Sequence, residues 1–234
     1  MGTLISLEFL KIKRKGIWFL VFLGPIGVVG LQAANFGIRY DWLTSQYAGH
    51  LWEGLLSNVG SLGVPALIIG SAIITSMLAN LEHQSRSWKQ WLAMPIKRWQ
   101  FYLSKLIVSV ILLSISTLML AIGAIVLGIA LDFGTDIPYY ELLKYCVFPT
   151  VAGLPIILGQ LWLAVRFPNQ SIAISIGVLG TVVSLWAYYA PLWLPWVWPY
   201  MLEGVTHTLL LSTAAGMIIT IISIGDFAKR EVRS

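Results

Sequence analysis

Charged residues are scarce in this sequence, and their scarcity decides the class of protein. Asp, Glu, Lys and Arg together make up 11% of the 234 residues, whereas 58% are hydrophobic and the mean hydropathy is +0.82. A water-soluble globule of this length needs more polar side chains to cover its surface. The sequence therefore predicts a protein whose main solvent is the lipid bilayer.

Cysteine is almost absent as well. The single Cys146 has no partner for a disulfide within the chain and cannot supply a paired-cysteine zinc site. Because it lies in an apolar run, we expect it to be a small buried core residue. We expect no metal and no cofactor.

The sequence also lacks the motifs of catalysis. No glycine is followed by lysine, so a phosphate-binding loop of the Walker type is excluded. The histidines His50, His83 and His207 are far apart, and no sequence pattern pairs them with a base or a nucleophile. An intramembrane enzyme, whose partner residues can be distant in sequence, has no positive support. We therefore expect a non-catalytic protein that takes the energy for any transport from a partner.

Six uncharged intervals reach the length of about 20 apolar residues that a membrane-spanning helix needs. The sequence predicts an all-α polytopic membrane protein with one domain over residues 1–234 and an inner loop at 80–105. Prolines and tryptophans after the fifth span indicate a hydrophobic outer loop at the interface. The predicted spans are residues 17–37, 59–79, 106–130, 145–165, 171–189 and 204–224.

The distribution of basic residues predicts the orientation. With the N-terminus inside, only Arg39 and Lys144 of the 15 Lys and Arg residues fall outside. Short loops retain basic residues on the cytoplasmic side, so we expect both termini there. The net charge of +5 then indicates contact with anionic membrane lipid and no nucleic acid.

Residues 3–15 suit an N-terminal interfacial helix, and residues 16–38 are long enough to form an uncleaved anchor.

The inner loop carries the most informative pattern in the chain. Glu82 and Arg86 are one helical turn apart and can pair. Trp88, Trp91 and Leu92 share one face of a short helix at spacings of three and four. Tryptophans among basic residues are not needed in a solvated connector, so we expect this loop to dock against a partner protein or the inner leaflet.

This loop resembles that of the permease subunits of type-2 ABC exporters. In that family the loop carries an acidic residue, a short helix, an L-x-x-P-[IV]-x-R stretch and a lysine at the next span. The matching positions here are Glu82, residues 85–92, residues 92–98 and Lys105. Arg86 and Ser87 stand where the family usually has Gly-Thr. That departure suits the compact branch that confers immunity to lantibiotic and bacitracin-like peptides.

The resemblance implies a mechanism and a set of partners. In this family the loop helix rests in a groove of a separate ATP-binding subunit, whose closure moves the spans. The implied partners are that subunit, a second permease copy or paralogue, membrane lipids, and a peptide or lipid-like substrate. The implied ATPase-coupling residues are Glu82, Ser85, Arg86, Trp88, Trp91, Leu92, Pro95 and Arg98.

The resemblance favours a permease in a bacterial cell membrane that expels, or confers immunity to, cationic peptide antibiotics. Export of a lipid or a small drug is an alternative within transport. A membrane scaffold or sensor subunit, which does not stimulate an ATPase, is an alternative from another class.

Overall fold

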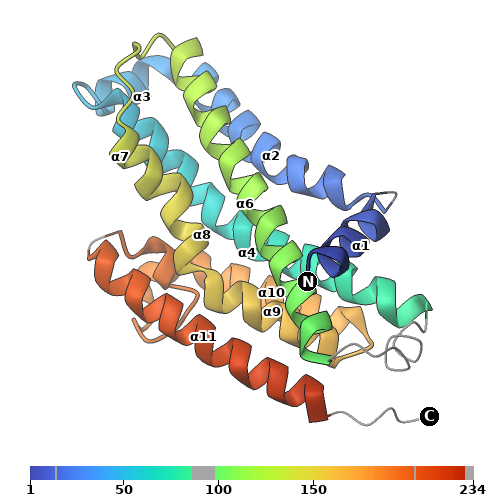
Figure 1. Ribbon diagram of the computed structural model, residues 1–234. Helices are drawn as coiled ribbons and strands as arrows, with labels where there is room; N and C mark the ends of the chain where they lie inside the picture. Colours follow the sequence, from blue (N-terminus) through green and yellow to red (C-terminus); the bar gives the residue numbers. More distant parts are fainter. Residues whose placement is uncertain (14, 86–97, 203, 230–234) are drawn as a thin grey trace.

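The computed structural model describes residues 1–13, 15–85, 98–202 and 204–229, whose regular elements are all helices, with no strand among them (Figure 1). The predicted all-α class is therefore confirmed for the described residues. The elements are α1 (Gly2–Ile12), α2 (Ile17–Ile38), α3 (Tyr40–Gln46), α4 (Leu51–Ser85), α6 (Arg98–Ala130), α7 (Tyr139–Leu142), the π-helix η1 (Leu143–Val147), α8 (Phe148–Ala152), α9 (Leu154–Arg166), α10 (Gln170–Leu185), the 3₁₀ turns η2 (Ala187–Tyr189) and η3 (Trp198–Tyr200), and α11 (Val205–Lys229).

Five helical segments are long and apolar enough to cross a bilayer. The helix at the predicted fifth span, α10, is apolar but has only 16 residues. Its length is about 24 Å at 1.5 Å per residue, less than the roughly 30 Å of a hydrocarbon core. The chain is a polytopic helical membrane protein with five spans by length, and a sixth crossing stays a prediction. The five segments are Ile17–Ile38, Leu51–His83, Trp99–Ala130, Tyr139–Arg166 and Val205–Phe227.

Several helices run past the uncharged intervals from which the spans were predicted. The predicted inner loop 80–105 is too wide, because α4 continues to Ser85 and α6 begins at Arg98. The predicted spans ended at charged residues because an unpaired charge is costly to bury. Glu82 and Lys105 form an ion pair inside the protein, so the helices that carry them can continue past the predicted ends.

The segment Tyr139–Arg166 also differs from the single helix predicted at 145–165. It consists of α7, η1, α8 and α9 in succession, with a π-helical turn before Pro149 and a break at Gly153. Proline has no N–H to donate to the carbonyl four residues earlier, and insertions of a π turn relieve such positions. The sequence pattern predicted a span here, but neither its full 28-residue extent nor its irregular core.

The long helix α4 forms the centre of the bundle and packs against α2, α6, α9 and α10. Its apolar side chains Leu55, Leu56 and Leu78 are fully buried. Its buried hydroxyls Ser71 and Thr75 donate to carbonyls of their own helix at 2.7 Å, which satisfies them without a partner helix.

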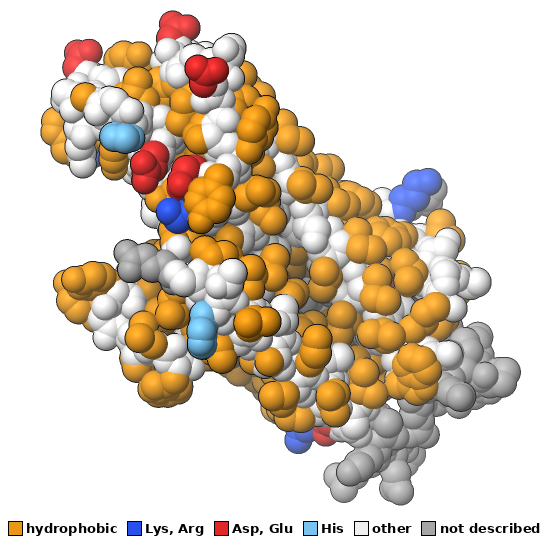
Figure 2. Space-filling view, turned by 60° about the vertical axis from the view of Figure 1, so that its left-hand side comes forward, with side chains coloured by type: hydrophobic (Ala, Val, Ile, Leu, Met, Phe, Trp, Pro, Cys, Tyr) orange, Lys and Arg blue, Asp and Glu red, His pale blue; other side chains and the backbone are white. Residues whose placement is uncertain are grey.

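Large apolar side chains cover much of the outer surface, as Figure 2 shows for one face. Leu210, Met217 and Ile221 on α11 and Leu31 on α2 are each more than 60% exposed. In water such a surface would drive aggregation, whereas acyl chains solvate it. The surface therefore agrees with a helix bundle embedded in lipid.

The two ends of the bundle differ in the helices that meet there. At one end, here called the loop end, α4 stops, α6 starts, and α1 and the last turn of α11 lie nearby (Figure 1). The opposite end, here called the far end, carries α3 and α7. At the loop end α1 lies against α6 and buries Leu4, Glu8 and Ile12 on one face. The predicted N-terminal helix is thus present, while its place at the membrane surface stays a prediction.

Candidate coupling site

Four charged side chains from three helices meet at the loop end. We call Glu8 and Lys11 of α1, Glu82 of α4 and Lys105 of α6 the ion cluster. The Lys11 Nζ donates to Glu8 Oε1 at 2.9 Å and to Glu82 Oε1 at 2.6 Å. The Lys105 Nζ donates to Glu8 Oε2 at 2.8 Å and to Glu82 Oε1 at 3.1 Å. Each carboxylate therefore binds both ammonium groups, and the four charges sum to zero.

The ion cluster is almost completely shielded from solvent. The side chains of Glu8, Glu82 and Lys105 are 1–2% exposed, and only Lys11 reaches the surface, at 28%. Burial by itself lowers the pKa of Lys11, but its bonds to Glu82 and Glu8 outweigh that effect and raise the pKa above its usual value of 10.5. Lys11 therefore stays charged at every physiological pH.

An aromatic side chain covers the ion cluster and connects it to α11. The ammonium nitrogens of Lys105 and Lys11 lie 4.9 and 5.5 Å from the centre of the Phe101 ring, within the range of cation–π attraction. Phe101 also stacks on Phe227 of α11, with ring centres 6.4 Å apart. Through Phe101, the ion cluster of α1, α4 and α6 is also in contact with α11.

A second polar contact joins α9 to α11 beside this site. The two oxygens of Asp226 accept from Trp162 Nε1 at 3.1 Å and from Arg166 at 2.8 Å. His83, one residue after Glu82, has its Nε2 within 3.3 Å of the Ala164 carbonyl oxygen. Polar and aromatic side chains therefore connect α1, α4, α6, α9 and α11 at the loop end.

The predicted coupling residues are placed only in part. Glu82 lies inside the ion cluster, and Ser85 and Arg98 are the last residue of α4 and the first of α6. Arg86, Trp88, Trp91, Leu92 and Pro95 lie outside the described residues. The predicted pairing of Glu82 with Arg86 therefore has no test here, whereas its pairing with Lys11 and Lys105 is observed.

Sequence reasoning missed the part that α1 plays. Glu8 and Lys11 were not singled out, although Glu8 sits four residues from both Leu4 and Ile12 and hence on the buried face of α1. A carboxylate on the apolar face of an amphipathic helix is costly to bury alone, so its presence there predicts a cation on a neighbouring helix. The identity of that cation, Lys105, could not be read from the local pattern because it lies 97 residues away.

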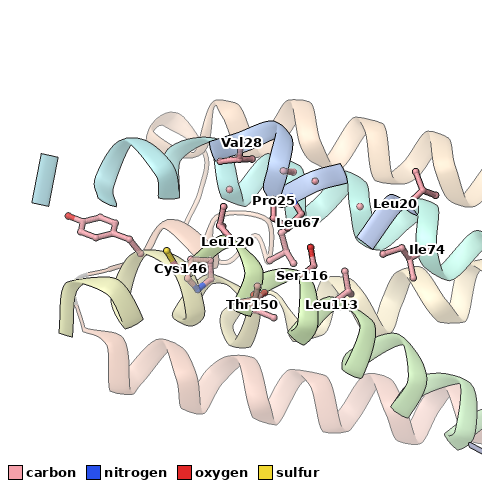
Figure 3. A pocket seen from close by; sticks show the side chains of 17 residues that line it. Leu20, Pro25, Val28, Leu67, Ile74, Leu113, Ser116, Leu120, Cys146 and Thr150 are labelled. Atoms are coloured by element: carbon pink, nitrogen blue, oxygen red, sulfur yellow. The ribbon is translucent and has the colours of Figure 1, made fainter. Parts of the chain in front are cut away.

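A small cavity lies deeper in the bundle, where α2, α4 and α6 meet the irregular segment η1–α8 (Figure 3). The hydroxyls of Ser116, Thr117 and Thr150 line it beside the buried thiol of Cys146. The burial of Cys146 confirms the prediction made for it. The cavity volume of about 50 Å³ accommodates one or two water molecules at about 30 Å³ each, not a peptide.

These features define a class of protein, a polytopic helical membrane protein. Among the described residues, its extensively buried charges gather beside the end of α4 and the start of α6. The family model described as ABC-2 family transporter protein matches residues 4–184, from α1 to the end of α10. The chain belongs to this family. It is accordingly a membrane permease component, and its family implies association with an ATP-binding subunit in a transporter.

The matched region contains the whole ion cluster and stops before α11. No curated protein and no solved structure gave a match.

Proposed function

We propose that this chain is the membrane-spanning permease of an ATP-driven exporter, and that residues 86–97 with the helix ends beside them receive the motion of the ATPase subunit. The ion cluster supports this proposal most directly. It joins the last turn of α4 and the second turn of α6, the two helices that flank residues 86–97, and it binds both to α1. A displacement of the connection is therefore passed to three helices together.

Within this proposal the predicted residues divide into two roles. Trp88, Trp91 and Leu92, whose spacing predicts a shared apolar face, enter a groove of the ATPase. Glu82 is a positioning residue, because it binds Lys11 and Lys105 of this chain and its side chain is 1% exposed. This differs from the sequence-based expectation that Glu82 itself seats in the groove.

The wider setting follows from the family resemblance. The permease pairs with a second copy or a paralogue in a bacterial cell membrane, with both termini in the cytoplasm. Its substrate is a cationic peptide antibiotic that acts at the envelope. Support comes from the acidic residues of the far end, among them Asp41, Glu53 and Asp132, which outnumber the basic ones there and attract cations.

The coupling role is tested on the complex of this chain with its co-purifying ATPase. Trp88→Ala should remove substrate-stimulated ATP hydrolysis and weaken recovery of the complex, because a buried aromatic anchor commonly contributes about 2 kcal/mol or more. Lys97→Ala is the control, since a charge at the rim contributes about 0 to 1 kcal/mol. Normal stimulation and normal assembly of the Trp88 variant would contradict the proposed site.

The substrate is tested separately in cells. Cells that express the permease with its ATPase should grow at higher concentrations of a cationic lantibiotic-type peptide than cells whose ATPase is inactive. An uncharged analogue of the peptide serves as the control. If the complex protects equally against both, or against neither, the cationic peptide is not the substrate.

A further inference from the structure

An apolar groove opens sideways near the far end, between two membrane-spanning segments. Its walls come from η1 and α8 on one side and from the first turns of α11 on the other. Its volume is about 290 Å³. Side chains from η1, α8 and α11, with Tyr140 at the end of α7, line it: Tyr140, Leu143, Lys144, Val147, Phe148, Val151, Val205 and Leu209.

The surroundings of the groove limit what can fill it. Both walls belong to helices that cross the membrane, so the groove opens toward acyl chains rather than water. Seven of its eight lining residues carry no charge and are largely hydrocarbon. An apolar cavity of about 150 Å³ can bind benzene, which has six carbons, so by that comparison the groove has room for about ten chain carbons. A single acyl chain fits this volume and chemistry.

The one charged lining residue stands where a lipid headgroup would be. Lys144 follows Tyr139, the first residue of its span, by about 8 Å along the helix. Its Nζ lies 3.4 Å from Glu141 Oε2 and 5.3 Å from the centre of the Tyr145 ring. An ammonium group has three donors, so this long ion pair leaves others for a phosphate.

Lys144 is also an exception in the charge pattern of the chain. Among the described residues, basic side chains are rare at the far end, where Arg39 and Lys144 occur. We propose that the groove binds one acyl chain of a membrane phospholipid and that Lys144 binds the phosphate of the same lipid. The site lies within one protomer and does not depend on the proposed transport function or on the orientation of the chain.

The full-length protein is tested in bilayer nanodiscs that contain a phospholipid with a photoactivatable group in its acyl chain. Crosslinks should concentrate in residues 143–151 and 205–209. Leu209→Trp fills the groove and should remove these crosslinks, whereas Leu210→Trp on the neighbouring, 71% exposed position should leave them in place. Both variants are first checked for unchanged thermal unfolding, and Val151→Trp replaces Leu209→Trp if the latter unfolds.

The phosphate contact is tested by competition. An unlabelled phospholipid should displace the probe better than a diacylglycerol with the same chains, and Lys144→Gln should abolish this difference. Even labelling of all lipid-facing helices, or unchanged labelling after the groove is filled, would overturn the acyl-chain site. Equal competition by diacylglycerol in the parent protein would overturn the role of Lys144.

Discussion

At the scale of single residues, the ion cluster is the most consequential feature of the protein. Taking a carboxylate or an ammonium group out of water is expensive, and the cost is offset only when opposite charges and hydrogen bonds replace the lost water. Here Glu8 and Glu82 each bind two ammonium groups, so the cluster is balanced while it is complete. Removal of one member leaves a buried charge without compensation.

Lys105→Met should therefore destabilise the protein strongly. It leaves two carboxylates near a single ammonium group, and breaking a buried pair in this way costs about 3 to 5 kcal/mol. Thermal unfolding in detergent measures the effect. The double variant Lys105→Met, Glu82→Leu should recover part of the loss, because it removes the uncompensated charge as well.

An exposed ion pair provides the matched control for this prediction. His50 and Glu53 lie 3.9 Å apart with side chains 78% and 51% exposed. Glu53→Gln should change stability by no more than about 1 kcal/mol. If Lys105→Met were as mild as Glu53→Gln, the ion cluster would not stabilise the fold.

At the scale of elements, α1 acts as part of the loop end rather than as a separate anchor. Glu8→Gln removes one negative charge but preserves the shape of the side chain, so α1 should loosen from Lys105 while the spans stay folded. We expect lower substrate-stimulated ATP hydrolysis with normal membrane insertion and normal recovery of the ATPase. Lys13→Gln, on the same helix end but outside the ion cluster, should leave the stimulation unchanged. Equal loss in both variants would refute a coupling role for α1.

The packing of α4 against α10 depends on a glycine. A Cβ at Gly177 would overlap the Cβ of Ala72 on α4, and Gln170 at the start of α10 donates to the Ser76 carbonyl at 3.0 Å. Gly177→Ala should force the helices apart and destabilise the protein by about 1 to 3 kcal/mol. Gly159→Ala on α9 meets open space and should be neutral or slightly stabilising. Equal unfolding temperatures for both variants would contradict this close approach.

At the scale of the whole molecule, the orientation in the membrane is the main prediction that the fold leaves open. Single cysteines at Ser234 and Thr135, each in a Cys146→Ser background, should react differently with an impermeant thiol reagent on intact cells. Thr135 is close to α7 at the far end and should react, whereas Ser234 should react only after the cells are opened. The reverse pattern would invert the predicted topology.

Much of the architecture was predictable because it depends on local composition. A run of about 20 apolar residues is solvated by lipid whatever it packs against, so membrane insertion and helical structure follow from the run itself. The loop pattern that runs from Glu82 to Lys105 likewise indicated the ABC-2 family, which the family match then established. The ends of α4 and α6 were misplaced for the opposite reason, since their length depends on partners in space.

What the sequence by itself determined is the solvent of this protein, its helical class and the position along the chain of the connection between α4 and α6. The tertiary structure alone decided how its few charges are used. Lys11 meets Glu82 across 71 residues and Lys105 meets Glu8 across 97, and no local periodicity records such a pairing. A buried charge is tolerated only beside its counter-charge, so only the packing of α1 on α4 and α6 could turn four isolated charged residues into one neutral site.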